Sequence, residues 1–335
     1  MNTQDHALQA DKQSPVTNNK RTANIKGVLK GICISEKRGT KKQEVPEASL
    51  KKDWGIEGDA HAGNWHRQVS LLSFDRIEEF RSKGAEVTFG DFGENLIIEG
   101  FDFKNLPVGT RFTIGDAVLE MTQIGKECHT HCAIYQQMGD CIMPREGVFS
   151  EVIKPGIIHV GDQVERIDPD PDRALTAAVI TLSDKGFKGE REDKSGPAIV
   201  EILTENGYKV IETVILPDVQ ARIERELIRL ADQRQVNLIV TTGGTGFSPR
   251  DCTPEATYNV ATRKAPGIAE AIRAGSMQIT RRAMLSREAS VIRNQTLIIN
   301  LPGSPKAVKE SLGFVIDQLD HGIRILTGRD GECAR

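Results

Sequence analysis

Two short segments of the sequence carry residue types that could do chemistry. In the C-terminal half, residues 243–253 (GGTGFSPRDCT) place glycines shortly before Arg250 and Asp251. In the N-terminal half, residues 128–132 (CHTHC) combine thiols and imidazoles, and Cys141 follows. Glycines allow backbone N–H groups to approach an anion closely, whereas thiolates are nucleophiles and soft-metal ligands. The sequence therefore indicates an anion site in one half and thiol chemistry in the other.

The acidic residue next to the glycines indicates a metal. A carboxylate beside anion-binding amides repels phosphate, unless a Mg²⁺ ion bridges the two groups. Asp251 is therefore a predicted Mg²⁺ ligand. Structural interpretations stay open at this point: Asp251 could cap a helix that begins near Thr253, Asp218 could cap a helix after Val219, and the glycines could form a tight turn.

The elements around the glycine segment alternate between strands and helices. Strands are predicted at residues 175–182, 208–216 and 236–242. The helix between the first two is predicted to begin with Ser195 as its N-cap, and the next helix is predicted to run through Arg234. This order predicts parallel strands with right-handed crossovers, in which ligands lie beyond the carboxyl ends of the strands. The same edge is expected to collect Ser183 and Asp184, Asp218, the glycine segment, and residues 300–305 (NLPGSP) after a strand at 296–299.

The N-terminal half has a different pattern. β-Rich runs at residues 27–35, 111–122 and 157–167 are separated by glycine-containing turns, with one helix at residues 74–83. This spacing predicts a closed or nearly closed β-barrel with a helical excursion. The basic run of Lys37, Arg38, Lys41 and Lys42 is interpreted as a solvated hairpin turn. His61 and His66 are interpreted as hydrogen-bonding partners rather than ligands, and the cysteine spacing disfavours structural zinc.

Bulk properties limit the possible classes of protein. A chain of 335 residues favours two domains. The net charge of −3 disfavours nucleic acid as a partner, and the absence of an apolar run of about 20 residues disfavours a membrane protein. With no export signal and six cysteines, a cytoplasmic chain with reduced thiols is expected.

The expected organisation has four parts. Residues 1–23 are predicted to be a disordered tail. Residues 24–167 form the barrel-like domain, and residues 168–173, rich in proline and acid, form a linker. Residues 174–335 form a three-layer α/β domain with a mostly parallel sheet.

The C-terminal motifs resemble those of the molybdopterin-binding MogA/MoaB-like proteins. The matching stretches are residues 241–257 (TTGGTGFSPRDCTPEAT), 216–218 (LPD) and 300–305, within a resemblance that covers nearly all of residues 174–328. It implies Mg²⁺-dependent adenylylation of molybdopterin by ATP, with Asp218 and Asp251 as catalytic carboxylates. The residues that it implies for binding phosphate, pterin or nucleotide are Ser183, Asp184, Gly243, Gly244, Thr245, Gly246, Asn300, Pro302, Gly303 and Ser304.

The N-terminal motifs resemble the MOSC domain. The matching stretches, within about residues 25–166, are residues 58–63 (GDAHAG), 67–72, 92–96 (FGENL), 106–123 and 157–164. The resemblance implies that Cys128 carries a persulfide sulfur or ligates molybdenum. Ile124 and Gly125 stand where the family usually has Pro-Arg, which puts the sulfur role in doubt. Cys132 or Cys141 could resolve a persulfide or be buried thiols, and burial is favoured for Cys141.

Together the two resemblances imply one chain that serves molybdenum cofactor biosynthesis. The C-terminal domain would adenylylate molybdopterin, and the N-terminal domain would carry sulfur or bind the cofactor. The alternatives are a non-catalytic molybdopterin carrier or scaffold, and an N-terminal reductase component. Implied partners are a cysteine desulfurase and a molybdenum-insertion protein, and relatives imply a homo-oligomer, trimer or hexamer. Molybdenum and tungsten are not distinguished.

Overall fold

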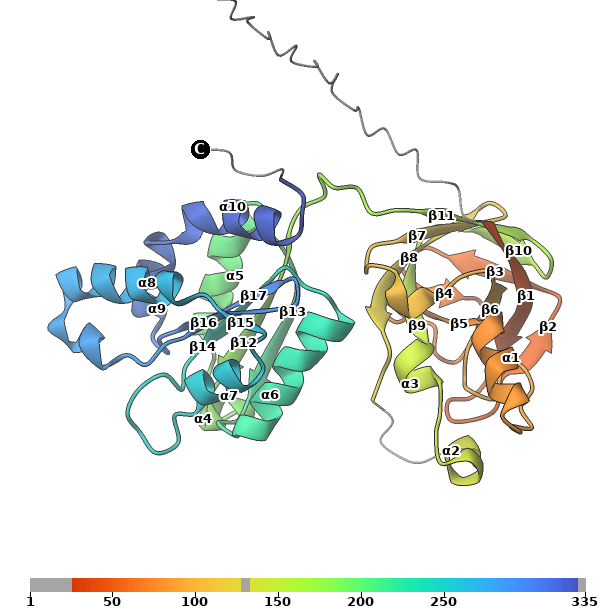
Figure 1. The fold of residues 1–335 in the computed structure, drawn as a ribbon, viewed down its shortest axis with the longest axis horizontal. Coiled ribbons are helices and arrows are strands. Elements are labelled where there is room, and N and C mark those ends of the chain that lie inside the picture. Colours follow the sequence, from red (N-terminus) through yellow and green to blue (C-terminus); the bar gives the residue numbers. More distant parts are fainter. Residues whose placement is uncertain (1–25, 128–132, 331–335) are drawn as a thin grey trace, which may run out of the picture.

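The computed structural model describes residues 26–127 and 133–330 (Figure 1). The N-terminal part is mainly β-structure. Its strands are β1 (Lys26–Ile34), β2 (Gln43–Val45), β3 (Glu47–Lys51), β4 (Gly55–Ile56), β5 (Val69–Ser73), β6 (Leu96–Glu99), β7 (Arg111–Ile114), β8 (Ala117–Ile124), β9 (Val148–Lys154), β10 (Gly156–His159) and β11 (Gln163–Ile167). Its helices are α1 (Phe74–Ser82), η1 (Phe103–Asn105), α2 (Ala133–Met138) and α3 (Met143–Glu146).

The N-terminal strands close into a barrel. The order is β11-β7-β8-β9-β5-β6-β1, and β1 pairs back onto β11, so seven strands form a ring; β2 adds to β1 outside it. Side chains such as Leu71, Phe112 and Leu119 fill the interior and are fully buried. The predicted closed barrel is confirmed. Residues 111–122 and 157–167, each predicted as one run, are two strands each, because turns at Gly115 and around Gly161, both with positive φ, interrupt them.

The C-terminal part is a three-layer α/β structure. Its strands are β12 (Thr176–Leu182), β13 (Lys209–Leu216), β14 (Leu238–Thr242), β15 (Arg263–Lys264), β16 (Ser290–Arg293) and β17 (Thr296–Leu301). Its helices are α4 (Asp184–Phe187), α5 (Ser195–Glu205), α6 (Gln220–Ile228), η2 (Arg229–Gln233), α7 (Thr253–Asn259), α8 (Pro266–Ile279), η3 (Arg281–Leu285), α9 (Pro305–Gly313) and α10 (Ile316–Leu326).

The sheet of the C-terminal part has the order β13-β12-β14-β17-β16-β15. The first four strands are parallel, and β16 and β15 continue the sheet antiparallel. Alternate residues of β12 point to opposite faces: Val179 packs with helices α5, α8, α9 and α10, and Ile180 packs with α6 and α7. Helices therefore cover both faces (Figure 1), which confirms the predicted fold class.

One of two local predictions in this part is wrong. Ser195 does not cap α5; it is the first helical residue, and the Asp193 carboxylate accepts hydrogen bonds from the N–H groups of Ser195 and Gly196 at 2.9 and 3.0 Å. A carboxylate two residues earlier satisfies the same orphan donors. The helix predicted to run through Arg234 is confirmed: α6 ends at Ile228, and the chain continues directly as the π-helical η2 to Gln233.

The two parts of the chain contact each other. The Arg234 guanidinium donates to the carbonyl of Thr122 at 2.8 Å, and the Val108 N–H donates to Oε1 of Gln235 at 2.9 Å. Arg225 of α6 lies 3.7 Å from Glu127. Among the described residues, no helix is both long enough and apolar enough to cross a membrane.

Candidate functional site

The carboxyl ends of β12 and β13 are tied together by two acidic residues. Asp184 follows β12 and Asp218 follows β13. The N–H of Asp184 donates to the Asp218 carboxylate at 3.2 Å, and the N–H of Asp218 donates to the Asp184 carboxylate at 3.1 Å. The Ser183 hydroxyl accepts from the N–H of Gly186 and so caps α4. Each carboxylate is therefore held at the sheet edge by the backbone of the other.

The glycine segment follows β14 and is packed closely between neighbouring strand ends. Gly243 and Gly244 have φ angles of 99° and 63°, which disfavour other residues. A Cβ on Gly243 would lie 2.4 Å from the carbonyl oxygen of Leu182, and a Cβ on Gly303 would lie 3.4 Å from the Gly243 Cα. The hydroxyl of Thr253 donates to the Gly243 carbonyl at 3.0 Å. The glycines are thus required by both conformation and space.

Neither Asp251 nor Asp218 caps the helix that was predicted to follow it. Cys252 precedes α7 and Val219 precedes α6, and neither helix has a side-chain cap. The Asp251 carboxylate accepts from the Ser248 N–H at 3.1 Å, which closes the turn of the glycine segment. The helix-cap interpretations of the two carboxylates are therefore contradicted.

These segments line one cleft of about 800 Å³. Eight of the predicted site residues line it: Ser183, Asp184, Asp218, Gly243, Gly244, Asp251, Gly303 and Ser304. Further lining residues that the sequence analysis did not select include Arg191, Lys194 and Ser195. The cleft therefore combines carboxylates, close-packed glycines and cations.

Four predicted residues do not line this cleft. Asn300 is fully buried: its amide donates to the hydroxyls of Thr241 and Thr257, and its oxygen accepts from the Ala289 N–H. The Pro302 carbonyl accepts from the Thr242 hydroxyl at 2.7 Å. The other two, Thr245 and Gly246, are held through their carbonyls by Arg287. In this structure these four residues support the walls of the cleft.

Arg287 is a positioning residue that sequence reasoning missed. Its guanidinium donates to the carbonyls of Gly246 and Asp251, each at 2.7 Å, and it pairs with Glu255. It therefore holds both ends of the turn that carries Asp251. Its position, just before β16, is 36 residues after Asp251 in the sequence, and no local spacing connects the two.

The carboxylates of the cleft are electrostatically coupled. Burial raises the pKa of Asp218, and the nearby charges of Asp184 and Asp251 raise it further. Hydrogen bonding to Arg250 lowers the pKa of Asp184. Accumulated negative charge of this kind favours a cation beside Asp218.

The donor set fits Mg²⁺ that binds together with substrate. Among residues 26–127 and 133–330, no group of three or more His, Cys, Asp or Glu side chains could hold a metal ion. Mg²⁺ is usually held by one or two carboxylates plus substrate phosphates, with several waters retained. Asp218 and Asp251 offer two carboxylates at one cleft. They would hold a metal that also needs phosphate oxygens, and such a metal would neutralise charge on the reacting phosphate.

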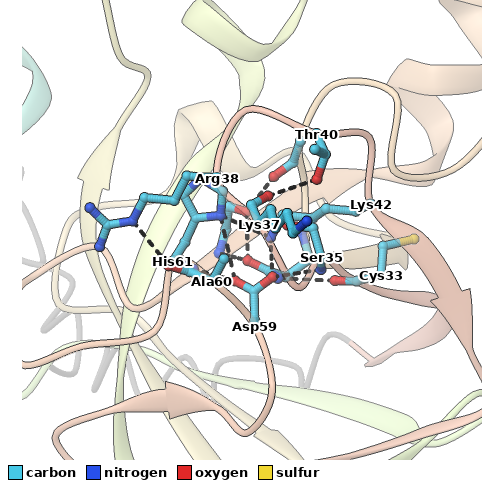
Figure 2. Close-up of polar contacts among 12 residues, drawn as sticks. Cys33, Ser35, Lys37, Arg38, Thr40, Lys42, Asp59, Ala60 and His61 are labelled. Atoms are coloured by element: carbon cyan, nitrogen blue, oxygen red, sulfur yellow. Dashed lines mark hydrogen bonds and ion pairs between the residues drawn. The ribbon is translucent and has the colours of Figure 1, made fainter.

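In the N-terminal part, the motif at residues 58–63 is held by a buried ion pair. The Asp59 carboxylate accepts from the N–H groups of Ser35 and His61 and from the ammonium of Lys42 (Figure 2). The side chains of Lys42 and Asp59 are 1% and 0% exposed. Lys37, Arg38 and Lys41 are exposed as predicted, but the prediction of a solvated Lys42 is wrong. Its ammonium is buried because Asp59 supplies a charge-assisted partner.

A smaller pocket of about 300 Å³ lies beside this ion pair. Its lining includes His61, Arg67 and Lys126, together with Trp65 and Phe149, over whose rings the Arg67 guanidinium lies at 4.7 and 5.6 Å. The pocket thus combines cationic and aromatic groups, which suits a flat anionic ligand.

The histidine and cysteine predictions have different outcomes. A ring nitrogen of His66 lies 2.9 Å from Oε1 of Gln123, which confirms its hydrogen-bonding role, and burial lowers its pKa to about 4. Cys141 is buried, as favoured. Cys128 and Cys132 lie outside the described residues. Lys126, two positions before Cys128, lines the pocket.

The fold and the cleft at the sheet edge define a class: α/β proteins that bind an anionic ligand at the carboxyl edge of a parallel sheet. Comparison with known families is consistent with that class and more specific. Residues 178–321 match the family described as a probable molybdopterin binding domain, and residues 58–165 match the MOSC domain.

Individual relatives match the C-terminal half. A molybdopterin adenylyltransferase of Helicobacter pylori is 42% identical over 158 residues, which cover 47% of this chain and 90% of the relative. A molybdopterin adenylyltransferase of Escherichia coli is 44% identical over 145 residues, which cover 43% of this chain and 74% of the relative. The structure of the molybdopterin biosynthesis enzyme MoaB from Thermus thermophilus is 43% identical over 46% of this chain and 97% of that chain, with a TM-score of 0.45. The chain therefore belongs to the molybdopterin-binding family that includes these adenylyltransferases, and it also carries a MOSC domain.

Proposed function

We propose that the C-terminal half catalyses adenylylation of molybdopterin by ATP with Mg²⁺, as a step of molybdenum cofactor biosynthesis. The observation that carries this proposal is the convergence of Asp218, Asp251 and the close-packed glycines Gly243 and Gly244 on one cleft. The similarity to named adenylyltransferases supports it.

The reaction requires positioning and charge control more than acid–base groups. An oxygen of the pterin phosphate attacks the α-phosphorus of ATP, and the bond to pyrophosphate breaks; the products are adenylylated molybdopterin and pyrophosphate. Backbone amides of a glycine segment suit phosphate oxygens. Asp218 and Asp251 would hold the Mg²⁺ that neutralises the developing charge. Arg287 would keep Asp251 in place through the two carbonyl contacts.

The test is pyrophosphate release from ATP and Mg²⁺ with molybdopterin present, using the full chain. Asp218→Asn and Asp251→Asn should each lower kcat by about 100-fold or more, since each removes charge stabilisation at the reacting phosphate. Asp317→Asn, on the first turn of α10, is the matched control and should keep wild-type activity. Pterin binding without any pyrophosphate release by the wild-type chain would leave a molybdopterin carrier instead.

For the N-terminal half we propose binding of the anionic, pterin-based cofactor in the pocket lined by Arg67, His61 and Lys126. The cationic and aromatic lining supports binding, and Cys128, close in sequence to Lys126, would be the molybdenum ligand. Sulfur carriage by Cys128 is the second candidate. Metal and pterin content of the purified chain separate the two: Cys128→Ser and Arg67→Gln should both lose bound molybdenum if the pocket binds cofactor. A persulfide on Cys128 by mass spectrometry, with no bound pterin, would favour sulfur carriage.

A further inference from the structure

Arg250 lies beside the cleft of about 800 Å³ and pairs with Asp184, one of the residues that line it. It belongs to the glycine segment after β14, and its guanidinium contacts Asp184, which follows β12. Nη2 of Arg250 lies 2.7 and 2.9 Å from the two carboxylate oxygens of Asp184, and Nε lies 3.2 Å from one of them. The pair therefore joins two segments that are 66 residues apart in sequence.

Separating the Arg250–Asp184 ion pair requires little free energy. The side chains of Arg250 and Asp184 are 59% and 38% exposed. Exposed ion pairs contribute about 0–1 kcal/mol, because water solvates both partners after separation. The guanidinium fork that fits a carboxylate also fits two oxygens of a phosphate. A phosphate in the cleft can therefore compete for Arg250.

Asp184 is the fixed member of the pair and Arg250 the movable one. The carboxylate of Asp184 also accepts from the N–H of Asp218 at 3.1 Å, a contact that does not depend on Arg250. The cleft itself carries further cations, Lys185, Arg191 and Lys194. A ligand with several phosphate groups would thus find fixed carboxylates, several cations and one arginine that is able to change partner.

We propose that Arg250 binds the polyphosphate chain of the nucleotide, and that Asp184 is its internal competitor, which releases the guanidinium when phosphate enters the cleft. This inference rests on the proposed nucleotide substrate, but it concerns a binding step that precedes chemistry. Arg250 then acts in nucleotide affinity, whereas Asp218 and Asp251 act in the transfer step.

The test is a double-mutant cycle on pyrophosphate binding by the full chain. Titration calorimetry with inorganic pyrophosphate, in EDTA and without pterin, compares the wild type with Asp184→Asn, Arg250→Gln and the double variant. The Asp184→Asn substitution keeps a side-chain oxygen for the Asp218 N–H but removes the charge that competes for Arg250. We expect roughly two- to fivefold tighter binding by Asp184→Asn, because the free energy of the exposed pair limits the gain, and at least roughly tenfold weaker binding by Arg250→Gln.

The double variant decides the mechanism. If Asp184 competes for Arg250, its substitution brings no gain once the guanidinium is absent, so the double variant should bind like Arg250→Gln. A gain that persists in the Arg250→Gln background would mean that Asp184 only repels anions, and would overturn the proposal. Weaker binding by Asp184→Asn would overturn it as well, because the pair would then be a structural support.

Two further measurements test which ligand Arg250 binds and distinguish this inference from the proposed adenylyltransferase function. Inorganic phosphate should show a much smaller effect of Asp184→Asn than pyrophosphate; an equal effect would assign Arg250 to a single phosphate, such as that of the pterin, and overturn the nucleotide assignment. If the cycle shows coupling between Asp184 and Arg250 in pyrophosphate binding, but the chain transfers no adenylyl group, the proposed function is contradicted and this inference is not. If the chain transfers adenylyl groups but the cycle shows no coupling between Asp184 and Arg250, only this inference is contradicted.

Discussion

Each half of the chain has a segment that combines glycines with an aspartate, and the two aspartates have different roles. Residues 58–63 place Asp59 where three donors surround its carboxylate, and its side chain is fully buried. Residues 243–251 place Asp251 in the wall of an open cleft. The comparison teaches that an acidic residue in a glycine-rich loop is a structural tie when buried donors satisfy it. It is available for chemistry when it lies at an open edge.

The two architectures explain this difference. In the parallel sheet, β12, β13, β14 and β17 all end at one edge, so the residues that follow them meet without further help. In the barrel, the loop after β1 and the loop after β4 meet through the Ala60 N–H, which donates to the Ser35 carbonyl at 2.7 Å, and through side chains. The Lys42–Asp59 pair makes that connection, and the pocket with His61 and Arg67 lies beside it.

Substitution of Lys42 should give the largest effect on stability. Lys42→Met leaves the Asp59 charge buried without its cation, which should lower the free energy of unfolding of the N-terminal half by about 3–5 kcal/mol. Both tryptophans, Trp54 and Trp65, belong to this half, so urea unfolding followed by tryptophan fluorescence reports on it.

The neighbouring lysine is the matched control for Lys42. Lys41 pairs with Asp91 at 2.7 Å but is 50% exposed, so Lys41→Met should cost about 0–1 kcal/mol. The double variant Lys42→Met with Asp59→Asn should recover part of the loss, because both charges are gone. Equal losses for Lys41→Met and Lys42→Met would contradict the structural role assigned to the buried pair.

Each half of the chain contains a buried glutamate that should make its stability depend on pH, so the two halves can be compared by unfolding at different pH values. Burial raises the pKa of Glu94 and of Glu288 from 4.5 to about 7. Between pH 4.5 and 7 the folded chain therefore binds more protons than the unfolded chain, so stability falls as pH rises and levels off above pH 7. Each glutamate contributes a loss of about 3 kcal/mol at pH 8.

Glutamine variants should respond differently in the two halves. Among the described residues, Oε2 of Glu288 is buried without a hydrogen-bond partner, so Glu288→Gln should raise the stability of the C-terminal half at pH 8 and remove its slope. The Glu94 carboxylate accepts from the N–H groups of Gly90 and Phe92. Because a glutamine can accept only one of these bonds well, Glu94→Gln should gain less. Urea unfolding at pH 5 to 8, by tryptophan fluorescence and by circular dichroism, measures both; an unchanged slope would refute the assignment.

Arg287 should show a smaller effect, confined to the C-terminal site. Arg287→Lys keeps the charge but loses the fork that contacts the carbonyls of Gly246 and Asp251. We expect kcat for pyrophosphate release to fall about tenfold, with KM for ATP nearly unchanged, because Asp251 is displaced rather than removed. Arg293→Lys, whose partners are Asp232 and Val260, is the control. A rise in KM without a change in kcat would instead place Arg287 in substrate binding.

Much of the C-terminal site followed from the sequence because its residues lie directly after strands. Hydrophobic runs located β12, β13, β14 and β17, and Asp184, Asp218 and the glycines came immediately after them. The residues that were missed depend on longer connections. Arg287 reaches the glycine turn from the segment before β16, and Asp193 replaces Ser195 as the cap of α5.

The barrel was less predictable in detail. Its closure through β1 and β11 agrees with the strand spacing, but two of the predicted runs are each interrupted by a turn. Lys42 follows three other basic residues in a segment that resembles a solvated turn. Only the arrival of the loop after β4 places Asp59 beside it.

The sequence by itself determined the two-part organisation, the parallel order of the C-terminal strands and the carboxylates at their ends, because hydrophobic periodicity and strand-end position are local properties. Tertiary structure alone decided which charges are buried and which residues are paired. Three contacts join segments that are distant in the chain: the buried pair of Lys42 with Asp59, the pair of Arg250 with Asp184, and the hydrogen bond from Arg287 to the Asp251 carbonyl. The free energy of such contacts depends on local solvent exposure and on partner geometry, and neither is encoded in the spacing of residues.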